Sequence, residues 1–549
     1  MLRYLIVFII FGGFFVSSMT IVKPGPMYPP TKGEVWPKPQ QQTKHEYYYT
    51  FDAAEFKVKV TDHTCPTLDS SSERYNFVLR DMKRIAHRTR ISLRKRNVRD
   101  AEHNDKHLGK IVRLDLKLTS PCEEYPYFGM DESYNLTIAT QSLLVSNSVW
   151  GILRGMETFS QLFYLADVNY EVRINKTEIY DYPRYAHRGL LIDTSRHYLS
   201  LTKIQKTLDA MAMNKMNVLH WHIVDDQSFP YKSDKFPDLS RMGAYHPSMV
   251  YDKQAIEGVI NYAKNRGIRV IPEFDVPGHT SSWGVAYPNI LTRCYQNGQY
   301  LGLGPMNPIH NVTYKLLQDL FREVQERFPD KYFHVGGDEV ELDCWESNTE
   351  LREYMTQHDM TSATQLHSLF MANVIPLLGN NAKAIVWQEV YDEDVTLSNG
   401  TLIHVWKDND INEMISILRD GHQLIYSSAW YLDHLKSGGD WADFYQADPR
   451  QMVRRYDNDV KVENIVGGEA CMWGEVVNDF NIISRVWPRA SAVAEKLWSA
   501  EINSVHEGFY DYRVPNDVYS RLEEHTCRMN RRGIHAQPPS GPGFCLGSV

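Results

Sequence analysis

The sequence predicts an α/β protein in which a (β/α)8 TIM barrel follows a small α/β domain with an antiparallel sheet. The first observation is a set of short apolar runs that alternate with amphipathic stretches from about residue 184 onward. The second is a set of runs before that point that alternate apolar and polar residues, such as IVRLDLKL and YNLTIA. The third is the length of 549 residues, which allows more than one domain.

The apolar runs are typical of strands that are buried on both faces, as in parallel sheets. They are GLLIDTS, NVLHWHIVDD, IRVIPEFD, YFHVGGDE, AIVWQEV, TLIHVW, LIYSSAWYLD and NIVGGEACMW. The amphipathic stretches between them, typical of helices, include Leu201–Lys215, Lys253–Arg266 and Tyr314–Phe328. Eight strands that alternate with helices predict a parallel barrel.

The sequence divides into four parts. Residues 1–18 (MLRYLIVFIIFGGFFVSS) are interpreted as a secretory signal peptide, and residues 19–44, rich in Pro and Lys, as an extended lead-in. Residues 45–180 form the N-terminal α/β domain, and residues 184–549 form the barrel with a C-terminal helical segment. A signal anchor is the alternative for the first part, but its apolar run is short for a bilayer span of about 20 residues. We therefore expect no membrane span after signal cleavage.

The charge balance argues against nucleic acid as a partner, because the net charge is −9. The basic stretch Lys83–Arg99 is interpreted as a solvated helix face and loop. Within it, Arg94-Lys95-Arg96 could instead be a processing site in a secreted protein, and the sequence leaves this open.

Two further features fit secretion. Seven cysteines permit three disulfides, and local pairing predicts 65–122, 294–344 and 527–545, with Cys471 left in an apolar run. None has CxxC spacing, so we expect no structural metal. The glycosylation triplets begin at Asn135, Asn175, Asn311 and Asn399, and the disulfide cysteines are Cys65, Cys122, Cys294, Cys344, Cys527 and Cys545.

Each predicted barrel strand ends in polar or aromatic residues. In a barrel of this kind the carboxyl ends of the strands meet at one face and build the active site. The expected site residues are Arg196, Asp225, Asp275, His279, Asp338, Glu339, Trp387, Trp406, Tyr431, Asp433, Trp473 and Glu475. His220 and His222 flank Trp221 and are interpreted as structural histidines, since no further metal ligand follows at a fitting distance. No metal or cofactor is expected.

Carboxylates and tryptophans at a barrel mouth suit carbohydrate. Cleavage of a glycoside needs a carboxylic acid to protonate the leaving oxygen and a second group opposite it. In HVGGDEVELDCW, however, the best pair, Asp338 and Glu339, is adjacent in the chain. Two acids that flank a bond normally come from different strands, so this pair calls for another arrangement.

The segments RGLLIDTSRHYL, NVLHWHIVDDQSFPY, RVIPEFDVPGHT, HVGGDEVELDCW, WYLD and GGEACMWGE, in this order, resemble the β-N-acetylhexosaminidases of glycoside hydrolase family 20, particularly the animal lysosomal type. The resemblance covers about residues 130 to 545, and it implies a non-catalytic N-terminal domain. It also implies a substrate-assisted reaction in which the 2-acetamido group of the sugar is the nucleophile. Glu339 would then be the acid and later the base, which needs a raised pKa, and Asp338 would orient the acetamido group.

The resemblance also implies roles for the other residues. Arg196 would hold the 3- and 4-hydroxyls, and Glu475 the 4- and 6-hydroxyls. Asp225, Asp275 and His279 would form a polar shell behind the acid. Trp387, Trp406 and Trp473 would wall the sugar, Tyr431 would donate to the acetamido oxygen, and Asp433 would lie beside these contacts.

Asp433-His434 bears on specificity. In the resembling family, a subunit that accepts anionic substrates has Asn-Arg here, and a subunit for neutral substrates has Asp-Leu. The carboxylate of Asp433 predicts preference for neutral terminal GlcNAc and GalNAc, which His434 would soften at acidic pH. Ser428-Ala429, where the family often has a proline, makes the Tyr431 loop a point of departure.

The resemblance therefore implies an exo-acting β-N-acetylhexosaminidase that forms a homodimer, and the signal peptide and glycosylation triplets predict that it is found in the lysosome or the extracellular fluid. The partners are glycans with terminal β-linked GlcNAc or GalNAc. The alternative is a secreted glycan-binding protein that lacks catalysis, which loss of Glu339, Asp338 or Tyr431 would have favoured. An endo-acting chitinase is disfavoured, because its DxxDxDxE run is absent.

Overall fold

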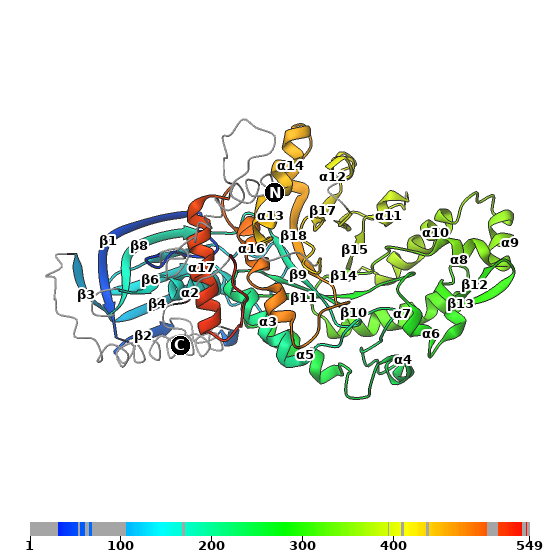
Figure 1. The fold of residues 1–549 in the computed structure, drawn as a ribbon, viewed down its shortest axis with the longest axis horizontal. Helices are drawn as coiled ribbons and strands as arrows, with labels where there is room; N and C mark the ends of the chain where they lie inside the picture. Colours follow the sequence, from blue (N-terminus) through cyan, green and yellow to red (C-terminus); the bar gives the residue numbers. More distant parts are fainter. Residues whose placement is uncertain are drawn as a thin grey trace, which may run out of the picture.

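The computed structural model describes residues 31–52, 55–60, 65–67, 106–166, 171–380, 382–393, 395–407, 411–434, 439–501, 514–540 and 545. The expected signal peptide, residues 19–30 of the lead-in and Arg94-Lys95-Arg96 lie outside these residues. Figure 1 shows the N-terminal sheet at one end of the molecule and the barrel beside it. Within the described ranges, no helix is both long and apolar enough to cross a membrane.

The N-terminal domain is a sheet with strand order β2-β4-β6-β5-β8-β1-β3, and β7 pairs with β8. The sequence predicts an antiparallel sheet, but the observed sheet is mixed, because β1–β3, β2–β4 and β4–β6 are parallel pairs. Alternation of apolar and polar residues indicates that one face of a strand is buried. It does not distinguish parallel from antiparallel pairing. The strands are β1 (Gln41–Phe51), β2 (Lys57–Val60), β3 (His107–Ile111), β4 (Arg113–Leu118), β5 (Tyr134–Thr137), β6 (Gln141–Ser146), β7 (Phe163–Leu165) and β8 (Val172–Asp181).

Helix α2 (Val149–Gln161) covers this sheet. It begins at Ser148, whose hydroxyl accepts a hydrogen bond from the backbone N–H of Gly151 at 3.1 Å. Two glycines let the helix lie close to the strands. A Cβ on Gly151 would lie 2.2 Å from the carbonyl oxygen of Ser133, and one on Gly155 would lie 2.3 Å from the side chain of Leu144.

The second domain is a closed barrel with strand order β10-β11-β14-β15-β16-β17-β18-β9, and every neighbouring pair is parallel. This confirms the predicted fold class. The barrel strands are β9 (His187–Asp193), β10 (Val218–Val224), β11 (Arg269–Phe274), β14 (Tyr332–His334), β15 (Lys383–Trp387), β16 (Leu402–Val405), β17 (Gln423–Tyr426) and β18 (Ile465–Met472).

Helices follow the barrel strands and cover their outer side (Figure 1). The longer ones are α3 (Leu201–Met213), α5 (Lys253–Lys264), α7 (Asn311–Arg327), α10 (Thr364–Val374), α12 (Ile411–Arg419), α14 (Pro449–Tyr456) and α16 (Arg489–Trp498). Shorter elements are α4 (Pro237–Gly243), α6 (Ser281–Gly284), α8 (Leu342–Ser347), α11 (Glu389–Asp392), α13 (Trp441–Gln446), α15 (Ile482–Val486) and the hairpin β12 (Leu291–Gln296) and β13 (Gln299–Met306). Helix α9 (Thr349–Gln357) instead lies at the far end of the molecule, beside α8 (Figure 1).

The interior of the barrel changes from apolar to polar along the strands. The lower layer is an apolar cluster of Val218, Ile271, Tyr332, Ile385, Leu402, Ile425 and Val466. Side chains on one face of a strand recur every second residue, so the next layer lies two positions further on. It contains His220, Glu273, His334, Trp387 and His404, which are all fully buried. This polar layer lies directly beneath the strand ends.

The two domains are joined by a buried ion network. Glu132 accepts hydrogen bonds from Arg154 of α2 at 2.8 Å and from Arg188 of β9 at 2.6 and 2.7 Å. Arg154 also donates to the backbone oxygens of Arg266 and Gly267, which lie in the barrel domain. Helix α17 (Asn516–Arg531) adds a second link, because it bonds both α16 and α2. One carboxylate therefore bridges two buried guanidinium groups at the domain boundary.

Replacing Glu132 with Gln should destabilise the protein strongly. Removing one partner of a buried ion pair leaves uncompensated charge and costs about 3 kcal/mol or more. We expect the urea midpoint of unfolding, followed by tryptophan fluorescence, to fall accordingly. The matched control is Glu46→Gln, since Glu46 pairs with Lys106 at the exposed surface. Equal midpoints for the two variants would contradict the account.

The disulfides join Cys65 to Cys122, Cys294 to Cys344, and Cys527 to Cys545, the pairs that local pairing predicts. Cys471 is free and buried. Three of the four expected glycosylation sites, Asn135, Asn311 and Asn399, are exposed.

The fourth expected glycosylation site, Asn175, is buried in the N-terminal sheet. It is 7% exposed, and its Nδ2 donates to the backbone oxygen of His45 at 2.7 Å. Because that nitrogen is the atom to which an N-linked glycan is attached, the folded structure opposes the expectation for Asn175.

Candidate active site

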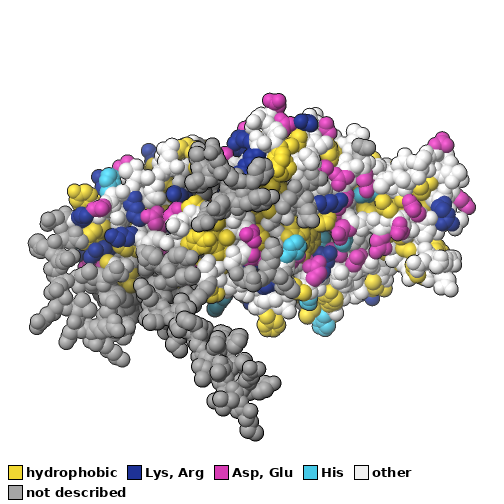
Figure 2. All heavy atoms as spheres, turned by 45° about the horizontal axis from the view of Figure 1, so that its top comes forward, with side chains coloured by type: hydrophobic (Ala, Val, Ile, Leu, Met, Phe, Trp, Pro, Cys, Tyr) yellow, Lys and Arg dark blue, Asp and Glu magenta, His cyan; other side chains and the backbone are white. Residues whose placement is uncertain are grey.

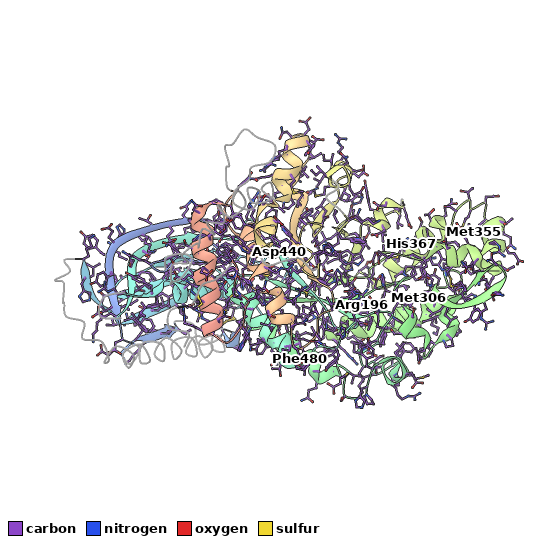
Figure 3. The ribbon with its side chains drawn as sticks, viewed as in Figure 1. Arg196, Met306, Met355, His367, Asp440 and Phe480 are labelled. Atoms are coloured by element: carbon purple, nitrogen blue, oxygen red, sulfur yellow. A yellow bond between two sulfur atoms is a disulfide. The ribbon has the colours of Figure 1, made fainter. Side chains whose placement is uncertain are left out.

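The expected site residues all lie at the carboxyl end of the barrel, where Figure 3 labels Arg196. Each strand of the barrel contributes at least one of them, and most lie in the loop that directly follows the strand. Arg196 follows β9, Asp225 follows β10, Asp275 and His279 follow β11, Asp338 and Glu339 follow β14, Trp387 ends β15, Trp406 follows β16, Tyr431 and Asp433 follow β17, and Trp473 and Glu475 follow β18.

The chain turns sharply between β14 and the two adjacent acids. Gly336 and Gly337 have φ angles of 69° and 102°, a region that glycine adopts readily. A Cβ on Gly336 would lie 1.7 Å from Oδ1 of Asp275, and one on Gly337 would lie 2.4 Å from the side chain of Val390. Glu339 itself has a φ of 49°, which is uncommon for a residue with a side chain. We call residues 336–339 the acid turn. Its glycines allow this turn to pack against the end of β11.

The two acids differ in their surroundings. Asp338 is 7% exposed, whereas the side chain of Glu339 is 59% exposed. Burial raises the pKa of Asp338 and of the neighbouring Asp275, and the charge of Asp338 raises the pKa of Asp275 further. Oδ1 of Asp338 and Oδ2 of Asp275 are buried and have no donor among the described residues. The charge of Asp338 therefore disfavours ionisation of Asp275.

His279 connects both acids to Asp225. Its Nδ1 lies 3.2 Å from Oδ1 of Asp225, and its Nε2 lies 3.6 Å from Glu339 and 3.7 Å from Asp338. Burial lowers the pKa of His279, but its contacts with Asp225 and Glu339 outweigh burial and raise that pKa well above its usual range. His279 is therefore a cation that faces Glu339.

The cation lowers the pKa of Glu339. This is opposite to the raised pKa that the sequence-based acid role requires. The physical reason is the direct contact with His279, together with the high exposure of the Glu339 side chain, which weakens the effect of burial.

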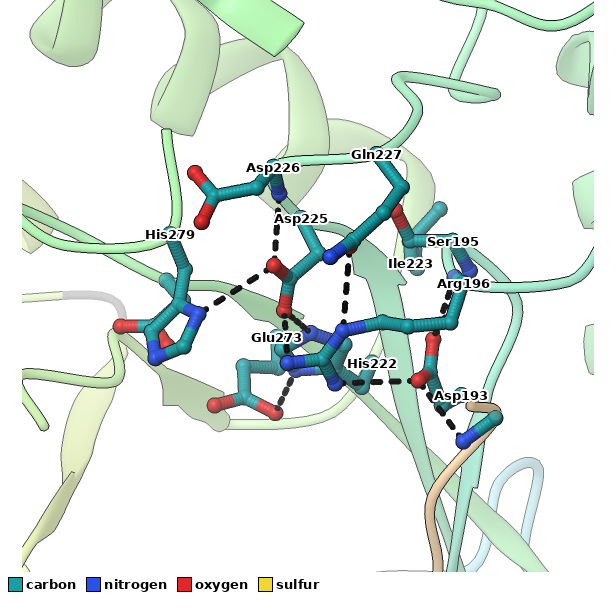
Figure 4. Close-up of polar contacts among 12 residues, drawn as sticks. Asp193, Ser195, Arg196, His222, Ile223, Asp225, Asp226, Gln227, Glu273 and His279 are labelled. Atoms are coloured by element: carbon teal, nitrogen blue, oxygen red, sulfur yellow. Dashed lines mark hydrogen bonds and ion pairs between the residues drawn. The ribbon is translucent and has the colours of Figure 1, made fainter. Parts of the chain in front are cut away.

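Arg196 is held by three partners (Figure 4). Its guanidinium lies 3.0 Å from Asp193 and 2.9 Å from Asp225, and its Nε donates to Gln227 at 3.2 Å. It also lies over the ring of Trp473, 5.0 Å from the ring centre. Two buried carboxylates thus fix the direction of this side chain.

The aromatic residues form one cluster with Leu191 and Cys471. The rings of Trp406 and Tyr431 stack at 6.1 Å, and those of Trp387 and Trp473 are 6.1 Å apart. Trp406, Tyr431 and Trp473 are partly exposed, whereas Trp387 is 1% exposed. Trp387 therefore forms the floor beneath the other rings more than an open wall.

Asp433 and Glu475 lie on the outer side of this cluster. Asp433 is partly buried, and its Oδ1 has no donor among the described side chains and backbone groups. Burial raises the pKa of Asp433. Glu475 is more exposed, and its carboxylate lies 3.8 Å from Arg196. His434, beside Asp433, is exposed.

Two carboxylates near the site, Asp193 and Glu273, were not expected from the sequence, and a third, Glu389, was expected only as part of the polar end of its strand. Asp193 holds Arg196 and accepts from the backbone N–H of Gly474 at 2.9 Å. Glu273 lies in the polar layer of the barrel. Glu389 accepts from the indole N–H of Trp406 at 2.9 Å, and burial, with the charge of Asp338, raises its pKa to about 7. The positions of Asp193 and Glu273 in the sequence could have indicated them. Each lies two residues before an expected site or loop residue, so its side chain lies on the inward face of its strand.

The rings of His220, His334 and His404 bring ring nitrogens within 4.8 Å of one another. Each of the three histidines also has a hydrogen-bond partner outside the cluster, and for His334 this is the backbone N–H of Gly336, which donates to Nδ1 at 3.1 Å. His220 lies 2.8 Å from Glu469, and His404 lies 2.6 Å from Oγ of Ser427. These contacts support the structural interpretation of His220, which stays a prediction.

A parallel barrel with paired acids, an anchored arginine and a tryptophan cluster at its carboxyl end defines a carbohydrate-cleaving class of enzyme. Residues 185–501 match the family described as glycosyl hydrolase family 20, catalytic domain. Residues 35–162 match the family described as beta-acetyl hexosaminidase like. The chain belongs to glycosyl hydrolase family 20 and is an enzyme.

Individual relatives agree over most of the chain. Beta-hexosaminidase subunit beta of Homo sapiens is 47% identical over 437 residues, covering 79% of this chain and 76% of that protein. Beta-hexosaminidase subunit alpha of Mus musculus is 41% identical over 524 residues, covering 93% of this chain and 94% of that protein. The chitobiase structure of Flavobacterium johnsoniae aligns with a TM-score of 0.74 and 28% identity over 92% of this chain and 74% of that chain.

Proposed function

We propose that this protein is an exo-acting β-N-acetylhexosaminidase that releases terminal β-linked GlcNAc and GalNAc by substrate-assisted, retaining hydrolysis. The observation that carries the proposal is the acid turn, which bears one exposed acid, Glu339, and one buried acid, Asp338. Adjacent acids on one turn are poorly placed to flank a bond from opposite sides. The acetamido group of the substrate then supplies the missing nucleophile. The relatives named beta-hexosaminidase support the same activity.

The reaction proceeds in two displacements at the anomeric carbon. In the first, the acetamido oxygen bonds to that carbon, the bond to the leaving oxygen breaks, and Glu339 gives its proton to the leaving oxygen. Asp338 accepts a hydrogen bond from the acetamido N–H, on which positive charge develops. In the second, Glu339 takes a proton from water, the water oxygen bonds to the anomeric carbon, and the acetamido group is restored. Two inversions give overall retention.

The remaining residues position the sugar. Arg196, with its direction set by Asp193 and Asp225, binds the 3- and 4-hydroxyls, and Glu475 binds the 4- and 6-hydroxyls. Tyr431 donates to the acetamido oxygen, and holding that oxygen in line with the anomeric carbon favours attack. The rings of Trp387, Trp406 and Trp473 enclose the acetyl methyl and the sugar face.

Glu339 becomes a competent acid when substrate is bound. A sugar in the site excludes water from its side chain, and desolvation raises a carboxyl pKa. This change opposes the effect of His279, which lowers the pKa of Glu339. Once the acid has given up its proton, the same His279 cation stabilises the carboxylate that acts as base.

The purified protein should cleave chromogenic β-glycosides of both GlcNAc and GalNAc. It should not measurably cleave the β-glucoside with the same leaving group, because that sugar has a 2-hydroxyl and no internal nucleophile. The measurement is release of the chromophore at matched substrate concentrations. Comparable cleavage of the glucoside would contradict the substrate-assisted step. If no glycoside is cleaved by folded protein, a glycan-binding role without catalysis replaces the proposal.

The carboxylate of Asp433 should make the enzyme prefer neutral sugars. We expect the 6-sulfated GlcNAc glycoside to have a kcat/KM about 10-fold or more below that of the neutral one, because like charges repel. Since burial raises the pKa of Asp433, the carboxyl becomes neutral as the pH falls through that value, and the discrimination should weaken toward acid.

The variant Asp433→Asn should narrow the ratio of neutral to sulfated kcat/KM at neutral pH and remove its pH dependence. The matched control is Asp479→Asn, an acid in the loop that follows Glu475. An unchanged ratio in Asp433→Asn would show that another group selects against sulfate.

We propose further that the protein passes through the secretory pathway to the lysosome or the extracellular fluid and assembles as a homodimer. Three disulfides and three exposed glycosylation triplets support the route. The relatives are named as subunits alpha and beta, which supports assembly. Light scattering on the purified protein, compared with the chain mass of 63.7 kDa, decides the oligomeric state.

A further inference from the structure

We propose that Glu273, in the polar layer beneath the site, is a positioning residue that orients both halves of the catalytic machinery at once. The proposal rests on the proposed function. Glu273 is 0% exposed, and its side chain contacts Trp387, His220, His222 and His334, so it acts through other side chains. It belongs to β11, and its register neighbours are His222 on β10 and His334 on β14.

The first half is the floor beneath the acetamido group. Oε1 of Glu273 accepts the indole N–H of Trp387 at 2.8 Å. Trp387 is 1% exposed and stacks on His404 at 4.2 Å between ring centres, so its ring plane is fixed from both sides. The rings of Trp406 and Trp473 pack against Trp387. Glu273 therefore sets the plane of the ring on which the remaining aromatic residues rest.

The second half is the chain of polar groups that leads to the acid. Oε2 of Glu273 bonds Nδ1 of His222 at 2.6 Å, and Nε2 of His222 bonds Asp225 at 2.8 Å (Figure 4). Asp225 in turn contacts His279, which faces Glu339. Glu273 and the acid are thus connected through three side chains that have direct contacts at each step.

The two halves both bond this carboxylate, and they also meet where the ring of His222 lies 4.9 Å from that of Trp473. Trp387 lies on β15 and His222 on β10, and β11 and β14 lie between them in the barrel order. One oxygen of Glu273 serves each half. A shift of the carboxylate would therefore move the acetamido floor and the acid chain together. Reaction rates are sensitive to such shifts, since a misplacement of about 1 Å can cost about 100-fold.

The charge of Glu273 also acts on the acid turn. Burial raises the pKa of Asp275 and of Asp338, and the negative charge of Glu273 raises both pKa values further. Burial raises the pKa of Glu273 itself, but nearby histidines outweigh burial and hold that pKa well below its usual range, so it stays ionised. The ionisable groups that interact with Glu273 are His220, His222, His334, His404, Asp275, Asp338 and Cys471.

The test is Glu273→Gln, which keeps the shape and removes the charge. We expect kcat on the GlcNAc glycoside to fall about 10- to 100-fold with KM nearly unchanged, because the group does not touch the sugar. We also expect the acidic limb of the kcat profile, where Asp338 loses its charge, to move to lower pH. Removing a neighbouring negative charge lowers the pKa of a carboxyl, and a merely structural defect would not move that limb.

The matched control is Glu469→Gln. Glu469 is a buried carboxylate of the same barrel that also bonds two histidines, His187 at 2.6 Å and His220 at 2.8 Å, but it contacts neither Trp387 nor His222. The Glu469→Gln variant should lose thermal stability to a degree similar to Glu273→Gln and should keep the acidic limb of the wild-type kcat profile.

A second variant covers the case in which Glu273→Gln does not fold. Glu273→Asp keeps the charge that the histidines need but withdraws the carboxylate by one methylene, so kcat should fall while the acidic limb stays in place. Wild-type kcat in a folded Glu273→Gln or Glu273→Asp protein would overturn the positioning role. An equal limb shift in Glu469→Gln would do the same. If wild-type protein cleaves no GlcNAc glycoside, the proposed function fails first, and the two failures remain distinct.

Discussion

The variant Glu339→Gln should lose about 1,000-fold in kcat on a glycoside with a poor leaving group, since general acid–base catalysis contributes roughly 10²- to 10⁴-fold. A loss of this size corresponds to about 4 kcal/mol of transition-state stabilisation. Gln has the same shape and cannot donate or accept the proton. KM should change little, because the exposed Glu339 side chain meets the leaving oxygen and not the sugar ring. Steady-state kinetics of both proteins at one pH give the comparison.

Leaving-group dependence identifies the role. A dinitrophenolate group leaves without being protonated. The Glu339→Gln variant should therefore carry out the first displacement on a dinitrophenyl glycoside and release a burst of chromophore. The attack of water should remain slow, because no base takes its proton. Azide is an anion that attacks without the help of a base, so added azide should speed turnover. The basic limb of the wild-type pH profile, where Glu339 loses its proton, should vanish. An equal loss on both substrates, without azide rescue, would assign Glu339 a binding role instead.

The barrel could be predicted from the sequence because each strand is an apolar run of suitable length. The loops at its carboxyl end could be predicted as the site because every run ends in polar or aromatic residues, from Arg196 to Glu475. The parallel pairs in the N-terminal sheet could not be predicted, since one-sided alternation is the same for both directions. The exposed fraction of Asn175 also depends on the neighbouring strand β1, to which no local pattern points.

The pKa shifts of the site could not be predicted either, because they depend on contacts between segments that are distant in the sequence. EFDVPGH places Asp275 and His279 near the acids, but the pKa of Glu339 is lowered chiefly because His279 is held between Glu339 and Asp225. Glu273 has an apolar neighbour on either side in the sequence and would ordinarily be a poor core residue. Its place becomes clear only when β10 and β14 bring three histidines around it.

Asp338→Asn is the second variant with a large expected effect, and we expect a loss in kcat of about 100- to 1,000-fold, the usual result of removing a group that stabilises transition-state charge. Asn keeps the shape but supplies no negative charge to the acetamido nitrogen. Because Asp338 acts on the nucleophile, a better leaving group should not restore the rate, in contrast to Glu339→Gln. Binding of a thiazoline analogue of the cyclic intermediate should weaken in parallel with kcat.

The pH profile gives a separate test of the same residue. Burial raises the pKa of Asp338, so the carboxylate, and with it the activity, is lost as the pH falls through that raised value. The wild type should therefore show an acidic limb above the pKa of an ordinary aspartate, and Asp338→Asn should lack it. Asp275, freed from the like charge beside it, should then ionise at lower pH. An acidic limb that persists unchanged in Asp338→Asn would assign that ionisation to another group and would leave Asp338 without its proposed charge.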